Sequence, residues 1–229
     1  MRPTELRIGG LAPLSSCDWP GELVATIFAR GCPFDCAYCH NPHLLAAGRG
    51  EVAWADVTAL LEARAGLLDG VVFSGGEPTA QPVLADAMRE VRELGFRVGL
   101  HTAGPFPERL ASVLPLVDWV GFDVKAPFAE YERVTRVPGS GADALASLRA
   151  LVSSGVDFEA RTTVHPDLLD AAALERLSAD LAAEGVSRWV VQAYRPTGAR
   201  PGLAAAGFAD ADVPVQARER FAHFEFRCA

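Results

Sequence analysis

Three of the five cysteines in this chain lie within eight positions, at Cys32, Cys36 and Cys39. Cysteines three or four positions apart rarely pair, and an odd number always leaves one thiol over, so a disulfide framework explains them poorly. Structural zinc needs four protein ligands, and His40 or His43 would have to supply the fourth. A [4Fe-4S] cluster held by three thiolates instead leaves one iron open for a substrate. The spacing therefore favours an iron–sulfur cluster, with zinc and simple burial as the alternatives.

Six short segments rich in β-branched and aromatic residues are predicted as strands, at 23–28, 71–73, 96–100, 119–124, 158–164 and 189–194. Apolar residues at helical spacing lie between them. Gly95, Gly155 and Gly185 each follow such a helical stretch and precede a strand, where a glycine commonly ends a helix. This alternation predicts an α/β fold with a parallel sheet, either flat and doubly wound or curled into a barrel.

Polar residues follow the carboxyl end of almost every predicted strand. They are Cys32, Cys36 and Cys39, then Ser74-Gly75-Gly76-Glu77-Pro78, His101-Thr102, Asp123 with Lys125, and His165. Both candidate architectures place their active sites at the carboxyl ends of the strands. Because packing does not explain this convergence, we expect these residues to line one site.

The bulk properties of the chain restrict the class of function. It has 229 residues, half of them hydrophobic, and a formal net charge of −8 at pH 7. This length suits one large domain with a sizeable core. The sequence contains neither the run of Lys or Arg typical of nucleic-acid or anionic-membrane binders nor an apolar stretch of the roughly 18 residues that a membrane helix needs. We therefore expect a soluble, cytoplasmic protein whose partner is a small molecule or another protein.

The cysteine segment Cys32-x3-Cys36-x-Tyr38-Cys39 resembles the signature of the radical S-adenosylmethionine (SAM) superfamily. Gly75-Gly76-Glu77-Pro78 resembles the SAM-binding turn of that superfamily. The segments "SCDWPG", "YCHNP", "FDVKAP" and "RTTVHP" narrow the resemblance to the activating proteins of anaerobic ribonucleoside-triphosphate reductase, which are relatives of the pyruvate formate-lyase activating enzyme. The resemblance runs from about residue 8 to about residue 195.

The resemblance implies a fold and two cofactors. The fold would be a partial (β/α)6 barrel of parallel strands, a single radical SAM domain over residues 1–229 with a core of about 20–195 and a C-terminal extension at 196–229. We expect a loop and a short helix in this extension. Cys32, Cys36 and Cys39 would hold a [4Fe-4S] cluster whose fourth iron binds SAM. Reductive cleavage of SAM would then give a 5'-deoxyadenosyl radical that abstracts a hydrogen atom.

The resemblance also assigns roles to individual residues, each with a plainer alternative. SAM would be contacted by Tyr38, Cys39, His40, Gly75, Gly76, Glu77, Thr102, Asp123, Lys125 and His165. In the plainer readings Tyr38 packs beneath the loop, the glycines form a tight turn, Glu77 is a first-turn helix acid, and Asp123 and Lys125 are an ordinary ion pair. His165 would be a buried loop residue in that reading. Asp18 would hold an incoming substrate loop or simply cap a turn.

Two features depart from the activating proteins. Related activases often carry Asp-Thr-Asn-Gly where this chain has His101-Thr102-Ala103-Gly104, which puts a monovalent-cation site in doubt. Cys17 and Cys228 stand alone in the sequence, so we expect them to bind nothing and expect no auxiliary cluster. This argues against superfamily members that use such a cluster for peptide maturation or sulfur insertion.

Three functions remain after these observations. The first is an activase that takes a hydrogen atom from a glycine Cα of a glycyl-radical enzyme, with anaerobic ribonucleotide reductase as the expected partner and a flavodoxin- or ferredoxin-type electron donor. An incomplete barrel would admit a folded partner's loop, and a glycine radical is stabilised by its two flanking amides. The second is a small-molecule radical SAM enzyme similar to 7-carboxy-7-deazaguanine synthases. The third is a zinc-bound interaction module without catalysis.

Overall fold

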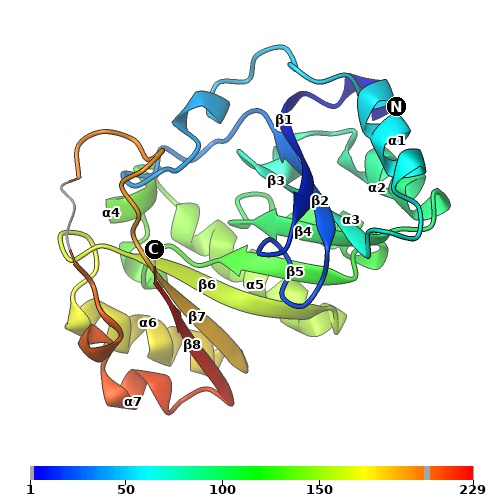
Figure 1. Cartoon of the computed structure of the whole chain (residues 1–229). Helices are drawn as coiled ribbons and strands as arrows, with labels where there is room; N and C mark the ends of the chain where they lie inside the picture. Colours follow the sequence, from blue (N-terminus) through cyan, green and yellow to red (C-terminus); the bar gives the residue numbers. More distant parts are fainter. Residues whose placement is uncertain (1–2, 204–206, 229) are drawn as a thin grey trace.

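The computed structural model describes residues 3–203 and 207–228. Its centre is an eight-stranded sheet in which the strands follow one another in sequence order (Figure 1). The strands are β1 (Ile8–Ser15), β2 (Val24–Ala29), β3 (Gly70–Gly75), β4 (Arg97–Thr102), β5 (Trp119–Asp123), β6 (Asp157–Val164), β7 (Arg188–Ala193) and β8 (His223–Arg227). Strand β1 pairs with β2 in antiparallel orientation, and every other neighbouring pair is parallel.

Seven α-helices and six 3-10 turns connect the strands within the described residues. The helices are α1 (Trp54–Ala63), α2 (Leu84–Glu93), α3 (Pro107–Val113), α4 (Glu132–Thr135), α5 (Ser140–Ser154), α6 (Ala171–Ala183) and α7 (Val215–Arg218). The 3-10 turns are η1 (Pro3–Glu5), η2 (Pro42–Leu44), η3 (Pro78–Ala80), η4 (Leu114–Leu116), η5 (Phe128–Glu130) and η6 (Asp210–Asp212). Gly95, Gly155 and Gly185 follow α2, α5 and α6 with positive φ angles, as predicted.

The six predicted parallel strands are confirmed as β2 to β7, and the parallel α/β fold with them. Two strands were not predicted. Strand β1 precedes the parallel set, and β8 lies in the C-terminal extension, for which we expected only a loop and a short helix. The extension does contain η6 and α7, but β8 then joins the sheet beside β7. The expectation for the extension was therefore incomplete.

A separate apolar cluster of Trp19, Val24, Val72 and Trp119 lies at the amino-terminal end of the strands. The rings of Trp19 and Trp119 stack with 5.6 Å between their centres. Gly99 leaves room for this packing, because a Cβ there would lie 2.9 Å from the Trp19 ring. Since the other end of the strands carries the polar residues, the cluster closes the sheet interior opposite the expected site.

No helix among the described residues has the length and apolar character needed to cross a membrane.

Candidate functional site

A cavity of about 650 Å³ opens at the carboxyl ends of the strands. Its lining includes Asp18 and every residue expected to contact the cluster or SAM, except His165. These residues are Asp18, Cys32, Cys36, Tyr38, Cys39, His40, Gly75, Gly76, Glu77, Thr102, Asp123 and Lys125. The parallel strands therefore do bring these residues to one rim, and a cavity of this size is within the range of small-molecule sites.

His165 is placed outside this lining. Its side chain is fully buried, and its ring packs edge-on against Tyr194 with 5.1 Å between the ring centres. Its Nδ1 accepts a hydrogen bond from the backbone N–H of Asp167 at 3.2 Å. His165 directly follows Val164, the last residue of β6. His165 is thus a buried residue outside the cavity lining, and its expected contact with SAM stays a prediction.

The cysteine loop, residues 32–39, is held mainly by its neighbours. The Cys39 N–H bonds the Cys36 carbonyl at 3.2 Å, and the Cys32 N–H bonds the Leu45 carbonyl at 3.1 Å. Burial raises the pKa of Cys32 to about 12 and also raises that of Cys36. Such thiols ionise when a metal compensates their charge, so cluster assembly here releases protons.

Within residues 3–203 and 207–228, no group of three His, Cys, Asp or Glu side chains is arranged to hold a single metal ion. A [4Fe-4S] cluster does not require that arrangement, because each cysteine binds a different iron atom. Cys32, Cys36 and Cys39 all reach the same cavity. Their donor type and common placement fit a cluster held by three thiolates.

Tyr38 belongs to the cysteine loop, and its side chain is 3% exposed. Its buried hydroxyl has no hydrogen-bond partner among the described residues, although Tyr38 lines the cavity. Burial raises the pKa of this hydroxyl, which therefore stays protonated. A buried hydroxyl without a hydrogen-bond partner beside a cavity can donate a hydrogen bond to a bound ligand. The residues present are thus compatible with a polar ligand such as SAM.

The glycines of the predicted SAM-binding turn are required by packing inside the protein. A Cβ on Gly75 would lie 2.6 Å from the Ala29 nitrogen, and one on Gly76 would lie 2.6 Å from the Gly31 carbonyl oxygen. Gly75 also has a φ of +104°. The N–H groups of Gly76 and Glu77 bond the carbonyls of Ala29 and Gly31 at 2.8 and 2.9 Å. The turn is therefore fixed to the segment that leads directly into the cysteine loop.

Glu77 organises this turn through four accepted hydrogen bonds. Its Oε1 accepts from the Thr79 N–H at 3.0 Å, the Thr79 hydroxyl at 2.6 Å and the Thr102 hydroxyl at 2.8 Å. Its Oε2 accepts from the Ala103 N–H at 3.0 Å. The side chain is almost fully buried, and burial raises its pKa in spite of these donors. Glu77 thus joins the ends of β3 and β4.

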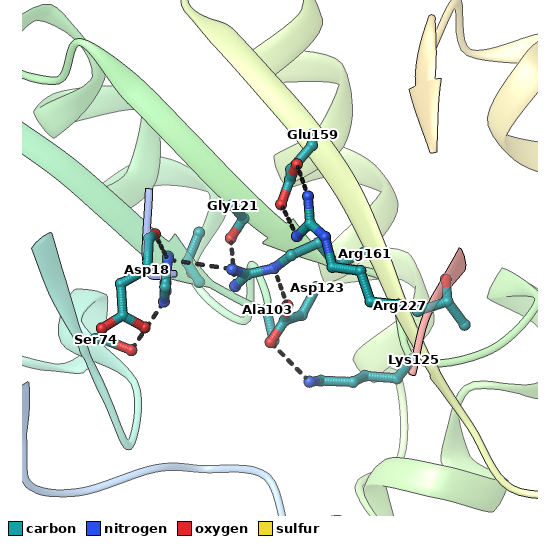
Figure 2. A network of polar contacts seen from close by, with 12 residues as sticks. Asp18, Ser74, Ala103, Gly121, Asp123, Lys125, Glu159, Arg161 and Arg227 are labelled. Atoms are coloured by element: carbon teal, nitrogen blue, oxygen red, sulfur yellow. Dashed lines mark hydrogen bonds and ion pairs between the residues drawn. The ribbon is translucent and has the colours of Figure 1, made fainter. Parts of the chain in front are cut away.

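Asp123 and Lys125 form an ion pair in the cavity wall, with 3.0 Å between Oδ2 and Nζ (Figure 2). Lys125 is the only lysine in the chain, since the other 20 basic residues are arginines. Its Nζ also lies 5.7 Å from the centre of the Tyr38 ring. Burial is the largest single influence and disfavours the Lys125 charge, but the Asp123 carboxylate together with Tyr38 and Cys36 outweighs it and raises the pKa of Lys125. Lys125 therefore carries its charge inside the cavity.

Arg161 is a site residue that the sequence analysis missed. Its Nε donates to Asp123 Oδ1 at 2.9 Å and its Nη2 donates to the Gly121 carbonyl at 3.2 Å (Figure 2). A Cβ on Gly121 would lie 2.6 Å from the guanidinium carbon, so the glycine makes room for this side chain. The signal in the sequence is the alternation of Glu159, Arg161 and Thr163 along β6. Buried parallel strands usually read as continuous apolar runs.

The two oxygens of Asp123 are thus shared between two cations. Burial acts to raise the pKa of Asp123, but Arg161 and Lys125 outweigh it and lower that pKa. The carboxylate stays ionised and holds both cations at the cavity wall.

His101, which stands where related activases often carry aspartate, links this group to Asp18. Its Nε2–H donates to the Asp18 carbonyl at 2.6 Å, and its Nδ1 accepts from the Ser74 hydroxyl at 3.0 Å. Arg161 Nη1 lies 3.1 Å from the same Nε2. Burial and the Arg161 charge lower the pKa of His101 to about 4. The imidazole is therefore neutral at pH 7. Its hydrogen bond to the Asp18 carbonyl holds the turn at Asp18 in place.

The lowered pKa of His101 predicts a loss of stability in mild acid. Between pH 6.5 and 4 the unfolded chain binds a proton at this histidine that the folded protein does not bind, so the free energy of unfolding falls as the pH falls. From pH 7 to pH 5 the wild-type protein should lose about 2 kcal/mol more than His101→Gln. Urea denaturation at both pH values measures this difference. An equal loss in the two proteins would show that His101 is not the titrating group.

Comparison with known proteins identifies the superfamily to which this chain belongs. The profile of the Radical SAM superfamily matches residues 26–177, and the chain belongs to this superfamily. A protein of Methanocaldococcus jannaschii named as a glycyl-radical enzyme activating enzyme is 29% identical over 200 residues, covering 82% of this chain and 80% of that protein. The pyruvate formate-lyase-activating enzyme of Clostridium pasteurianum is 31% identical over 173 residues, covering 72% of this chain and 71% of the relative.

Comparison with solved structures gives the class of the fold. The crystal structure of Streptococcus suis SuiB superposes with a TM-score of 0.61 at 13% identity. The superposition covers 87% of this chain but 47% of SuiB, so this chain spans about half the length of that protein. The eight-stranded, mostly parallel sheet is the partial barrel of radical SAM enzymes. As a radical SAM enzyme, the protein uses a [4Fe-4S] cluster and SAM.

Proposed function

We propose that this enzyme is an activase that installs a radical on a glycine of a partner enzyme, and that the partner is an anaerobic ribonucleoside-triphosphate reductase. The observation that carries the proposal is the open side of the barrel. Strands β1 and β8 are the two edges of the sheet and do not pair with each other within the described residues. Cavity residues come from both edges, Cys17 and Asp18 beyond β1 and Arg227 and Cys228 at β8. In this proposal the partner's loop reaches the cavity between these two edges.

The similarity to a named activating enzyme over most of both chains supports the same class of reaction. Bound together, the cluster and SAM supply a one-electron cleavage of SAM to methionine and a 5'-deoxyadenosyl radical. The residues of this chain position the reactants and exclude competing groups. A glycine Cα is a suitable hydrogen donor because it has no side chain to obstruct its approach. A flavodoxin- or ferredoxin-type protein would supply the electron.

Within this proposal, Lys125 and Asp123 bind the methionyl carboxylate and the ribose hydroxyls of SAM. Tyr38 lies beside the adenine, and the turn at Gly75, Gly76 and Glu77 receives the SAM ammonium group. Asp18 holds the incoming loop. Its side chain is already oriented, because Oδ2 accepts a hydrogen bond from the Thr26 hydroxyl at 2.6 Å and the backbone carbonyl accepts from His101. The cytoplasmic location and the single-domain organisation remain predictions from the sequence.

Lys125→Ala is expected to weaken SAM binding about tenfold or more while leaving iron content unchanged, because it removes one charge-assisted contact. Lys125→Arg should also bind SAM more weakly, since the Lys125 side chain is 13% exposed and the larger guanidinium does not fit the same position. Isothermal titration of the cluster-loaded proteins with SAM measures both effects. If both variants bound SAM with wild-type affinity, the Asp123–Lys125 pair would have a purely structural role.

The reaction itself is tested by its products. Reduced enzyme and SAM are incubated with the candidate reductase, and 5'-deoxyadenosine is measured by chromatography. We expect up to about one equivalent of 5'-deoxyadenosine per reductase glycine, because each radical is installed once. The matched control is a reductase whose radical glycine is replaced by alanine, which should give only the slow background cleavage of SAM. Deoxyadenosine formed with a small-molecule substrate alone would favour the alternative related to 7-carboxy-7-deazaguanine synthases.

A further inference from the structure

The segment that follows β7 lies against the cysteine loop. One of its ends is hydrogen-bonded to that loop, and the other to His40, the residue that directly follows the loop. The Arg195 carbonyl accepts a hydrogen bond from His40 Nε2 at 2.8 Å, and the Arg200 N–H donates to the Cys39 carbonyl at 2.8 Å. We call residues 195–200 the strap. The strap lies outside residues 26–177, to which the superfamily profile extends, so it belongs to the part of this chain that the profile does not describe.

The strongest contact of the strap is made by the Arg200 guanidinium. Its Nη2 bonds the Asp35 carboxylate, and its Nη1 donates to the Asp35 carbonyl at 3.4 Å. Asp35 directly precedes Cys36, so one arginine is bonded to residues on either side of this ligand, namely Asp35 and Cys39. The Arg200 side chain is 23% exposed. The Asp35 side chain is 49% exposed, so the value of this pair lies in the geometry fixed by two hydrogen bonds from one guanidinium as much as in its charge.

The opposite side of the loop rests on the segment around α4. The Asp35 N–H donates to the Thr135 carbonyl at 2.9 Å, and the Ala37 N–H donates to the Val134 carbonyl at 3.2 Å. Arg136, just beyond α4, reaches the second carboxylate oxygen of Asp35 at 3.4 Å with a side chain that is 52% exposed. The cysteine loop is therefore held between α4 and the strap.

The loop needs such support because it forms neither helix nor strand. Three thiolates must each reach a different iron atom of one cluster, and small displacements of a ligand loop weaken a metal site. The α4 side fixes the loop through the backbone of Asp35 and Ala37. The strap side fixes it through the backbone of Cys39 and the side chain of Asp35. Without the strap, the Cys39 carbonyl would lose its hydrogen bond from the Arg200 N–H.

We propose that the strap holds the cysteine loop in its cluster-binding conformation, and that Arg200 is the positioning residue through which it does so. Arg200 acts through Asp35 and Cys39 and is not among the residues that line the cavity. The inference rests on the superfamily assignment and not on the identity of the partner. Its failure would therefore leave the proposed activase function untouched.

The test measures how fast the protein loses its cluster. Wild type, Arg200→Met and Asp35→Asn are reconstituted anaerobically, an iron chelator is added, and the decay of the cluster absorbance is followed. Arg200→Met retains the aliphatic stem and removes the guanidinium. We expect it to lose its cluster about two- to fivefold faster than wild type, the effect of a partly exposed ion pair. Asp35→Asn should accelerate the loss similarly, and Arg200→Lys should restore part of the wild-type lifetime.

Two matched controls distinguish the strap from general stability. Arg218→Met removes a guanidinium that pairs with Asp210 in the same C-terminal extension, away from the cavity lining, and should leave the cluster lifetime unchanged. Arg136→Met removes the more exposed partner of Asp35 and should have a smaller effect than Arg200→Met. If Arg200→Met does not fold, Asp35→Asn decides the question. Wild-type cluster lifetimes in both Arg200→Met and Asp35→Asn would overturn the proposal.

Discussion

Replacing any one of Cys32, Cys36 or Cys39 by alanine is expected to abolish the [4Fe-4S] cluster. The wild-type protein should bind about four iron atoms and four sulfides per chain after anaerobic reconstitution, with brown, oxygen-sensitive absorbance. Each single variant should fall to nearly zero, because a cluster with only two protein ligands is not retained. Iron and sulfide analysis together with the visible absorbance spectrum measures this loss.

The remaining two cysteines provide the matched control. Cys17 and Cys228 are exposed and lie at the rim of the same cavity, but outside the cysteine loop. Cys17→Ala and Cys228→Ala should keep the full iron content. Loss of iron in either variant would mean that the ligands have been assigned wrongly. Binding of about one zinc and no iron by the wild-type protein would contradict the cluster altogether.

The second large effect is expected from Glu77→Ala. This substitution removes the acceptor of four hydrogen bonds and leaves the N–H groups of Thr79 and Ala103 without a partner in a buried position. Each buried donor left unsatisfied costs about 1–3 kcal/mol, so the free energy of unfolding should fall by about 3–5 kcal/mol. Because the same carboxylate joins the ends of β3 and β4, SAM affinity should fall as well. Denaturation with urea and titration with SAM measure the two effects.

Glu77→Gln and Glu51→Ala serve as the comparison for this prediction. Glu77→Gln keeps one oxygen acceptor and should cost less than the alanine substitution. Glu51 has a side chain that is 61% exposed and pairs with Arg30, so Glu51→Ala should change stability by only about 0–1 kcal/mol. A change of less than about 1 kcal/mol in Glu77→Ala would show that the buried carboxylate does not organise the turn.

The six central strands could be predicted because buried parallel strands are short runs of β-branched and aromatic residues. Strand β1 was not predicted because Gly9, Gly10 and Pro13 interrupt its strand pattern. An edge strand tolerates such residues. Strand β8 has a readable alternation in "HFEFR", but it follows a segment rich in Ala, Gly and Pro, whose composition indicated a loop. Pairing with β7, a contact between distant parts of the chain, is what makes it a strand.

The candidate site was predictable to the extent that its residues follow strand ends. This rule placed Asp123 and Lys125 correctly at the rim. It did not bring His165 to the cavity lining, because that ring is buried against Tyr194, and the contact of His165 with SAM stays a prediction. It also missed Arg161, whose long side chain reaches the cavity from within the strand and depends on the missing side chain of Gly121. Such three-dimensional complementarity is not visible in local sequence patterns.

The central claim, that this enzyme generates a radical on a partner's glycine, is tested most directly by electron paramagnetic resonance. Reduced, cluster-loaded enzyme is mixed with SAM and an anaerobic ribonucleotide reductase, and the spectrum of the mixture is recorded. The proposed function predicts a doublet signal from a glycyl radical, which disappears when the radical glycine of the reductase is replaced by alanine. A mixture with active SAM cleavage that shows no protein radical with this or any other glycyl-radical enzyme would contradict it.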